Sequence, residues 1–291
     1  MGHFVDDDHN TQLINAAAEG KYIEVLCVLQ SGADVNGCGR QNDKYGNALQ
    51  AASAKGFKDI AILLLNRGAQ VNADGGRYGN ALQAASANGH KDIVGVLLEK
   101  GAEVNSYGGE YHYSLVAAAG MGHIHVVQRL LEGKANVNLK SGSYGTALHI
   151  ALERGHSNIA ILFLDKGAKI DSDAFRHAAR GNHHVLKLLA EKVPYNNKND
   201  KVSLCYYGAL EEATYYGNGP AVELLKHNAE VDTQLLSTAL TRGHLGVLKS
   251  LLRHSVECDV DVLIPQLDEI YRYIVGRLMS AASRHNTLSS S

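Results

Sequence analysis

The sequence predicts an all-α fold: a solenoid of about eight helix-turn-helix repeats, joined by hairpin-like loops and closed by a C-terminal helix. Two observations predict this class. A segment that begins at Tyr45 recurs from Tyr78, a period of 33 residues, and such self-similarity is typical of stacked repeat proteins. Each copy also contains two short helical patterns, and neither can bury its apolar face alone, so neighbouring copies must stack to form a core.

Several copies of the repeat can be aligned in the first part of the chain. The two strongest are YGNALQAASAKGFKDIAILLLNRGAQVN, from Tyr45 to Asn72, and YGNALQAASANGHKDIVGVLLEKGAEVN, from Tyr78 to Asn105. Weaker copies run from Tyr111 to Asn138 and from Tyr144 to Asp171, and an earlier one from Thr11 to Asn36. Less regular copies follow, so we expect one array over residues 11–257.

Each copy has recognisable start and stop signals for two helices. In the second strong copy, Asn80 can cap a short Ala-rich helix, which Gly89 ends. A second helix then carries Ile93 and Leu97 at helical spacing before Gly101 ends it. The residues expected to cap the first helix in three copies are Asn47, Asn80 and Thr146. The polar, Gly-rich residues between copies are typical of a projecting hairpin-like loop.

These motifs resemble the ankyrin repeat, which is marked by TPLH, a mid-repeat Gly-His and a closing GADVN. The clearest matches are TALH at Thr146 to His149, Gly-His at Gly89-His90, Gly122-His123, Gly155-His156 and Gly243-His244, and GADVN at Gly32 to Asn36. NALQ in place of TPLH resembles fungal-type arrays with YGNALQAAS repeats. The resemblance implies a binding module without catalytic activity that holds a partner protein along the concave face of the stack.

Four segments differ from the regular array. Residues 1–10 are expected to form an N-terminal arm, and an insertion at 194–205, Pro194 to Cys205, follows the sixth copy. Pro265 opens an amphipathic pattern, so residues 258–280 are expected to be a C-terminal capping helix. The apolar face of that pattern consists of Leu267, Ile270, Ile274 and Leu278. We expect a disordered tail over residues 281–291.

Composition and charge narrow the classes of partner. Lys and Arg number 28 against 30 Asp and Glu, which gives a formal net charge of -2. This charge does not attract the chain to nucleic acid or to an acidic membrane surface. No apolar run approaches the roughly 20 residues of a membrane-spanning helix. The cysteines, Cys27, Cys38, Cys205 and Cys258, form no zinc motif. We therefore expect no metal, no cofactor, and an intracellular protein that is cytoplasmic or nuclear.

The chain contains 15 histidines, a residue type that can serve as a general base or a metal ligand. Five occupy motif positions at which the resemblance implies structural hydrogen bonds in turns and between repeats: His90, His123, His149, His156 and His244. Two others are the candidate general bases. His112 stands between Tyr111 and Tyr113, and His177 lies on a later inner helix.

Tyrosine is frequent, with 14 residues against four Phe and no Trp. Tyr45, Tyr78, Tyr111 and Tyr144 precede the first helix of their copies, at the junction of loops and inner helices in an ankyrin stack. One interpretation is that each ring packs on its counterpart in the next repeat. The other is that the rings line the concave side beside Val116 to His123, whose small residues would leave a hollow. Tight packing of an Ala-rich helix would also explain those small residues.

Two functions remain open at this point. In the first, the stack binds a partner protein, and a small aromatic or conjugated molecule is the alternative ligand. The residues expected to make this binding surface are Tyr107, Tyr111, His112, Tyr113, Tyr144, His177, Tyr206 and Tyr207. In the second, the chain is a cofactor-independent isomerase or cyclase. His112 or His177 would then take a proton, and a phenol such as that of Tyr113 would stabilise a developing enolate oxygen.

Overall fold

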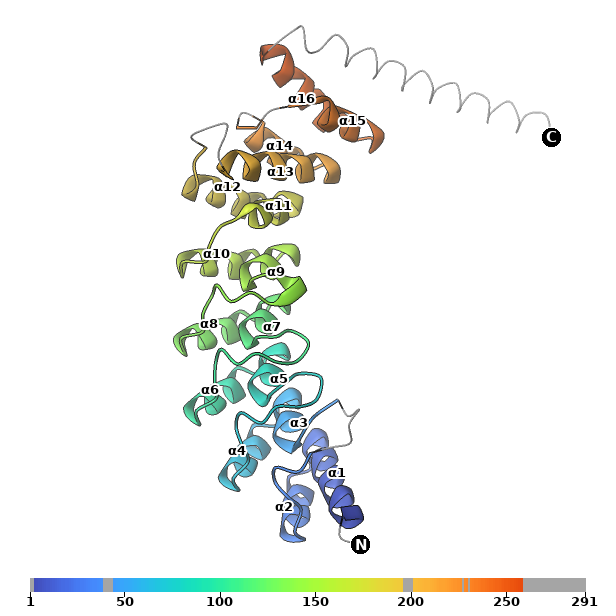
Figure 1. Cartoon of the computed structure of the whole chain (residues 1–291), viewed down its shortest axis with the longest axis vertical. Coiled ribbons are helices and arrows are strands. Elements are labelled where there is room, and N and C mark those ends of the chain that lie inside the picture. The colour runs from blue at the N-terminus through green and yellow to red at the C-terminus, as the bar shows by residue number, and fades with distance from the viewer. Residues whose placement is uncertain (1–2, 39–43, 196–200, 227, 230, 259–291) are drawn as a thin grey trace, which may run out of the picture. The chain divides into compact units, whose positions relative to one another are not determined.

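The computed structural model describes residues 3–38, 44–195, 201–226, 228–229 and 231–258. These residues form sixteen α-helices and one short 3-10 helix (Figure 1). They divide into two compact units, Met1–Lys169 and Ile170–Ser291. The prediction of an all-α helical repeat is confirmed.

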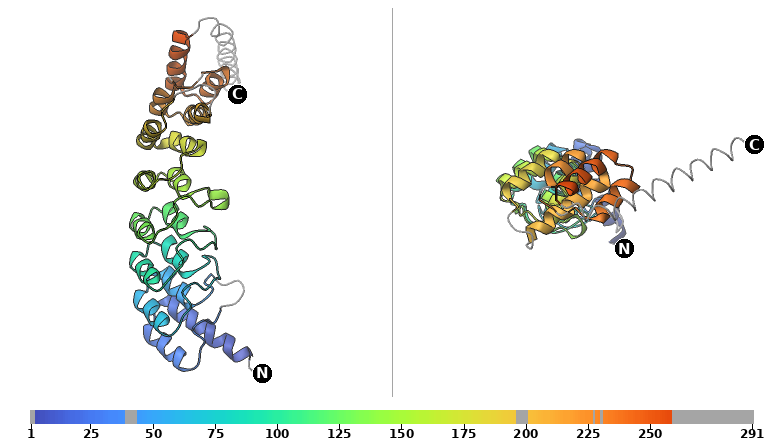
Figure 2. Two further views of the ribbon diagram at one scale, coloured as in Figure 1. Left: turned by 60° about the vertical axis from the view of Figure 1, so that its left-hand side comes forward. Right: turned by 90° about the horizontal axis from the view of Figure 1, so that it is seen from above.

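The first unit is built from five helix pairs. The pairs are α1 (His3–Glu19) with α2 (Tyr22–Gln30), α3 (Ala48–Lys55) with α4 (Lys58–Asn66), α5 (Ala81–Ala87) with α6 (Lys91–Glu99), α7 (Ser114–Gly120) with α8 (Ile124–Glu132), and α9 (Ala147–Glu153) with α10 (Ser157–Asp165). The first helices of successive pairs contact one another, and so do the second helices, which gives two rows (Figure 1, Figure 2). The 3-10 helix, η1 (Gly142–Tyr144), precedes α9.

The starts of α3 and α5 follow from two of the expected caps, those at Asn47 and Asn80. At the start of α3, Oδ1 of Asn47 accepts a hydrogen bond from the N–H of Gln50 at 2.9 Å. At the start of α5 the exchange is reciprocal: the N–H of Gln83 donates to Oδ1 of Asn80, and the N–H of Asn80 donates to Oε1 of Gln83. Gly56 ends α3 in the left-handed conformation, with φ +86°, which a residue with a Cβ adopts only at a cost.

Small side chains let the first helices pack closely. Every residue of α5 and of α7 is buried, and Ala117, Ala118 and Ala119 have no exposed surface. The second helices add leucines that are equally buried, such as Leu64 and Leu97. The core of this unit is therefore continuous from one pair to the next, as repeat stacking requires.

Histidines at the Gly-His motif join each repeat to the one before it. In each case Nε2 donates a hydrogen bond to a backbone carbonyl near the end of the preceding first helix, where the helix itself provides no partner. The pairs are His90 with Ala54 (3.1 Å), His123 with Ala87 (3.2 Å), His156 with Gly120 (3.2 Å) and, in the second unit, His244 with Tyr215 (3.1 Å). The fifth histidine, His149, accepts a hydrogen bond from the N–H of Thr146 through Nδ1 at 3.1 Å. The structural role expected for these histidines is confirmed.

Asparagines at the end of each copy make a second link between repeats. The side-chain oxygen of each accepts a hydrogen bond from a backbone N–H of the following copy. The pairs are Asn36 with Gln70 (2.7 Å), Asn72 with Glu103 (2.9 Å), Asn105 with Asn136 (2.8 Å) and Asn138 with Lys169 (2.8 Å). We call this series the asparagine ladder.

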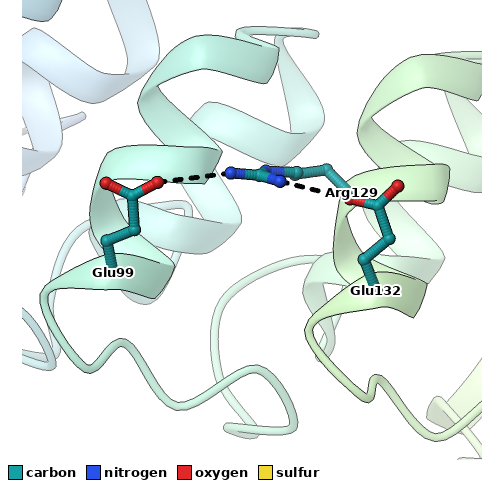
Figure 3. A network of polar contacts seen from close by, with 3 residues as sticks. All are labelled: Glu99, Arg129 and Glu132. Atoms are coloured by element: carbon teal, nitrogen blue, oxygen red, sulfur yellow. Dashed lines mark hydrogen bonds and ion pairs between the residues drawn. The ribbon is translucent and has the colours of Figure 1, made fainter.

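The second helices are also linked at the surface by ion pairs. Arg129 of α8 contacts Glu99 of α6 at 3.3 Å and Glu132 of its own helix at 3.2 Å (Figure 3). The side chain of Arg129 is 40% exposed and the two glutamates are more exposed still. Solvent screening therefore keeps the contribution of this network to stability small.

The second unit continues with helix pairs of less regular length. The pairs are α11 (Ser172–Gly181) with α12 (His183–Lys192), α13 (Lys201–Tyr216) with α14 (Gly219–Leu225), and α15 (Thr233–Thr241) with α16 (Leu245–Cys258). Phe175 and Tyr206 are fully buried at its centre, with ring centroids 5.1 Å apart. Two aromatic side chains thus form part of the core of this unit.

The segments expected to differ from the array are only partly described. From His3 onward, the residues of the N-terminal arm form the first part of α1. The last residues of the insertion, from Lys201 to Cys205, form the first turns of α13, which is why this helix is longer than other first helices of its unit. The capping helix beyond Cys258 and the C-terminal tail lie outside the described residues.

Candidate functional site

Three of the expected site residues meet on the loop that joins α6 to α7. The rings of Tyr107 and His112 stack, with centroids 4.8 Å apart and planes inclined by 13°. The ring of Tyr113 meets that of Tyr107 edge to face, with centroids 5.5 Å apart. Tyr107 is nevertheless 61% exposed. We call Tyr107, His112 and Tyr113 the loop cluster.

The backbone of this loop is a tight hairpin. The N–H of Gly108 donates to the carbonyl of His112 at 2.9 Å in an antiparallel bridge. His112 has φ +64°, a conformation that is uncommon for residues other than glycine. Such a residue needs support from its surroundings, and two sets of hydrogen bonds provide it.

The first support is the buried carboxamide of Gln83, on the first helix of the preceding repeat. Its Nε2 lies within hydrogen-bond distance of the carbonyls of Ser106, Gly108 and His112, at 3.2, 3.0 and 2.9 Å. Gln83 is 2% exposed. A single buried side chain therefore holds both strands of the hairpin.

The second support comes from Ser141, in the next loop. Its hydroxyl donates a hydrogen bond to the carbonyl of Tyr111 at 2.9 Å, and its oxygen lies 3.0 Å from Nδ1 of His112. Because the single hydroxyl proton is used on the carbonyl, Nδ1 of His112 must be the donor in the second bond.

Tyrosines of successive loops stack beside the first helices. The rings of Tyr45 and Tyr78 are 6.4 Å apart and those of Tyr111 and Tyr144 are 5.6 Å apart, each pair close to parallel. Tyr78 and Tyr144 also pack against a buried group that contains Tyr111. Burial raises the pKa of the Tyr111 hydroxyl, and the charge of Glu110 adds to this effect. The interpretation that these rings pack on their counterparts agrees with the structure.

The hollow expected beside α7 is filled. Gly120 shows how tightly, because a Cβ built on it would lie 2.6 Å from Cδ1 of Ile150. The alanines of α7 have no exposed surface. The small residues from Val116 onward thus serve packing, which was the other explanation for them, and the expected pocket is corrected accordingly.

The expected site residues of the first unit therefore fall into two groups. Tyr107, His112 and Tyr113 form the loop cluster, of which Tyr107 is the exposed member. Tyr111 is only 8% exposed and Tyr144 is half-buried. These two rings stack on each other beneath the surface and are poorly placed to contact a partner.

In the second unit, the expected residues take structural positions. Tyr206 is 1% exposed, and its hydroxyl donates to the carbonyls at the end of α12, at 2.9 Å in the case of Val193. It therefore lies in the core and not on a binding surface. The hydroxyl of Tyr207 donates to Oδ2 of Asp232 at 2.6 Å, and His177 is half-buried on α11.

One exposed aromatic group of the second unit did not figure among the expected sites. Tyr215 and Tyr216, at the end of α13, are 39% and 52% exposed. The guanidinium carbon of Arg242 lies 3.6 Å from the ring centroid of Tyr215, and that of Arg180 lies 5.5 Å from Tyr216. The sequence signal is the Tyr-Tyr pair directly before Gly217, at a turn where regular copies carry small or polar residues.

The described residues also bear on other classes of site. They contain no group of three or more His, Cys, Asp or Glu side chains placed to hold a metal ion. Nor is any helix in the described ranges long and apolar enough to cross a membrane.

The fold and the loop cluster together define a helical repeat protein in which loops and first helices present side chains from successive repeats. The family model described as ankyrin repeats (three copies) matches residues 13–108 and 109–174. The chain belongs to the ankyrin-repeat family. Proteins of this family are generally protein–protein interaction modules. A search of curated protein sequences finds no significant match to the chain.

Proposed function

We propose that this protein is a binding module whose loop cluster anchors a partner protein on the face formed by the loops and first helices, the concave face of an ankyrin stack. The observation that carries the proposal is the state of Tyr107, which is 61% exposed and yet held between His112 and Tyr113. A large aromatic side chain that is already immobilised loses little conformational entropy on binding, and tyrosine is enriched among the residues that dominate interface energies.

The surroundings of the loop cluster support a protein partner. The hairpin is fixed by Gln83 and Ser141, so the site is organised before the partner arrives. Arg77 and Glu110, which form an ion pair across neighbouring loops, provide charged groups beside the aromatic surface. An aromatic centre with a polar rim is the usual arrangement of a protein interface. The alternative of a small-molecule isomerase required the hollow beside α7, which packing fills.

The test compares proteins captured by the full chain and by Tyr107→Ala. The substitution removes an exposed side chain, so the variant should keep the thermal unfolding midpoint of the wild type within a few degrees. Binding of the captured partner, measured by calorimetry, should weaken by about 2 kcal/mol or more, as for an anchoring aromatic residue.

Tyr216→Ala is the matched control, because Tyr216 is 52% exposed and belongs to the other aromatic group. A partner anchored on the loop cluster should bind this control as it binds the wild type. Equal affinity of the partner for the wild type and Tyr107→Ala would refute the proposal.

A further inference from the structure

A groove lies between α2 and α4, in the row of second helices and away from the loop cluster. It has a volume of about 720 Å³. Its apolar walls include Tyr22 and Phe57 at the turns, and Ile60, Ile62 and Leu63 along α4. Tyr22 is 40% exposed. We call this feature the α2–α4 groove.

The α2–α4 groove arises where the first repeat departs from the pattern of the next two. The first two residues of α4 are Lys58 and Asp59, and α6 begins with the same pair. The corresponding first residues of α2 are Tyr22 and Ile23. Ile23 is 71% exposed. Two positions that carry charges in the neighbouring repeats thus carry projecting apolar side chains in the first.

A second departure, in the second repeat, occurs at the turn before α4. Phe57 stands where His90 stands in the next repeat, and its ring packs on Gly20 as the ring of His90 packs on Gly56. Phenylalanine adds apolar wall to the groove and, unlike His90, makes no hydrogen bond to the preceding helix.

A groove at the equivalent place between α8 and α10 allows a direct comparison. It has a volume of about 310 Å³, and the first residues of α10 that line it are Ser157 and Asn158. The α2–α4 groove is thus both larger and more apolar than its counterpart. Apolar surface of this kind on a soluble protein marks an interaction site more often than an accident of packing.

The charges at the rim indicate what covers the groove. Lys58 and Asp59 are both exposed, and among the described residues neither takes part in an ion pair. The rim of the α2–α4 groove therefore carries an unpaired positive charge directly beside an unpaired negative one. A two-fold axis through such a patch places Lys58 of one copy against Asp59 of the other, and does so twice.

We propose that the α2–α4 groove is the interface of a symmetric dimer of this chain. The exposed side chain of Ile23 from each copy enters the groove of the other, between Tyr22 and the apolar residues of α4. The rim pair of Lys58 and Asp59 then sets the register. In an isologous contact the same surface is used by both copies, so that surface must complement itself. This surface does so, because it carries the projecting Ile23, the groove that would receive it, and one charge of each sign. The inference does not depend on the function proposed for the loop cluster.

The test is sedimentation velocity of the full chain over about 1 to 100 µM protein. The wild type should show a concentration-dependent dimer. The variant Tyr22→Lys with Ile23→Asp places at the start of α2 the pair that begins α4 and α6, so it should fold, and it should raise the dimer Kd at least about 30-fold. The matched control makes the same changes in another repeat, Ser157→Lys with Asn158→Asp, and should leave the dimer intact.

A charge exchange tests the two-fold register by itself. Lys58→Glu places two like-charged pairs at the rim and should weaken the dimer at least about tenfold. Adding Asp59→Lys restores opposite charges across the axis and should restore most of the affinity. This second test remains decisive if the variant of α2 does not fold.

Three results would overturn the proposal. A wild-type chain that is monomeric throughout the concentration range excludes a second copy as the occupant of the groove. A dimer that survives Tyr22→Lys with Ile23→Asp in a folded protein places the interface elsewhere. If Lys58→Glu leaves the dimer Kd unchanged, Lys58 of one copy does not face Asp59 of the other, and the proposed register is excluded.

Discussion

Nε2 of Gln83 lies 2.9 Å from the carbonyl oxygen of His112, a residue 29 positions further along the chain. The donor belongs to the first helix of one repeat and the acceptor to the loop that opens the next. The residue that ends the NALQ motif therefore supports the conformation of the loop cluster without contacting a partner itself.

Gln83→Ala should destabilise the protein by about 1–3 kcal/mol, because it removes the buried carboxamide that bonds to the carbonyls of the hairpin and to the N–H of Asn80. Hydrogen exchange should accelerate in residues 106–112 in particular. Gln128→Ala, on the exposed side of α8, is the control and should change the free energy of unfolding by under about 0.5 kcal/mol. Unchanged exchange in the hairpin of Gln83→Ala would show that this side chain does not hold the loop.

Gly120→Ala should destabilise the protein by about 1–3 kcal/mol, because the added methyl group would lie 2.6 Å from Cδ1 of Ile150. This exceeds the gain in helix propensity of at most about 1 kcal/mol. Combining it with Ile150→Val removes that atom, so the double variant should be at least about 0.5 kcal/mol more stable than the sum of the single effects predicts. Strict additivity in chemical unfolding would contradict the contact.

Gly95→Ala provides the opposite case on a neighbouring helix. Here the added methyl group would approach the guanidinium of Arg129 at 3.3 Å, and this flexible end can move toward solvent because the side chain is 40% exposed. The expected result is a gain of up to about 1 kcal/mol in the free energy of unfolding. A loss of stability would show that the ion pairs of Arg129 with Glu99 and Glu132 hold its guanidinium over Gly95.

Alkaline unfolding should depend on Tyr111. Burial raises the pKa of this hydroxyl, so the folded state favours the neutral phenol. Its contribution to stability is complete below the unfolded-state pKa of about 10 and is lost as the pH rises through the higher folded-state value. Tyr111→Phe keeps the ring on Tyr144 and should lose less stability than the wild type between about pH 10 and 12. Parallel stability curves for the two proteins would contradict this.

The ion pair of Arg77 with Glu110 should make a small contribution at neutral pH. The hydrogen bond from Arg77 lowers the pKa of Glu110, so stability from this carboxylate is present above the unfolded-state pKa of about 4.3 and is lost as the pH falls through the lower folded-state value. Both side chains are at least about a third exposed, so Glu110→Gln should cost under about 1 kcal/mol at pH 7. The difference from the wild type should vanish near pH 3 and shrink in high salt.

The fold could be predicted from the sequence because each signal was local and repeated. The caps at Asn47 and Asn80 and the Gly-His turns depend on a few adjacent residues, and their recurrence every 33 residues excludes a chance match. The motif histidines could be assigned structural roles for the same reason. Irregular segments, such as the start of α13 within the expected insertion, lack a second copy to confirm them.

The site was predictable only as a region. Proximity of Tyr107, His112 and Tyr113 in the chain indicated an aromatic group, and the structure confirms that the three rings meet. Burial could not be read in the same way, because it depends on side chains from other repeats. Tyr206 lies in the core, since its ring packs on Phe175. The prediction of a hollow beside α7 was wrong because Ile150, one repeat away, fills the space beside Gly120. The α2–α4 groove was missed because Tyr22 and Ile23 depart from the pattern only when compared with Lys58 and Asp59.

The asparagine ladder has a consequence for how the length of this array can change. In each of its links the acceptor is the asparagine that closes one copy, and the donor is a main-chain N–H group of the next. Since every residue except proline offers that donor, the link places almost no demand on the side chains of the repeat that receives it. A duplicated copy of residues 78–110 could therefore join the array with this connection already made, and its surface residues could diverge afterwards. Growth and diversification of the binding surface are in this way separated from the bonds that hold the stack together.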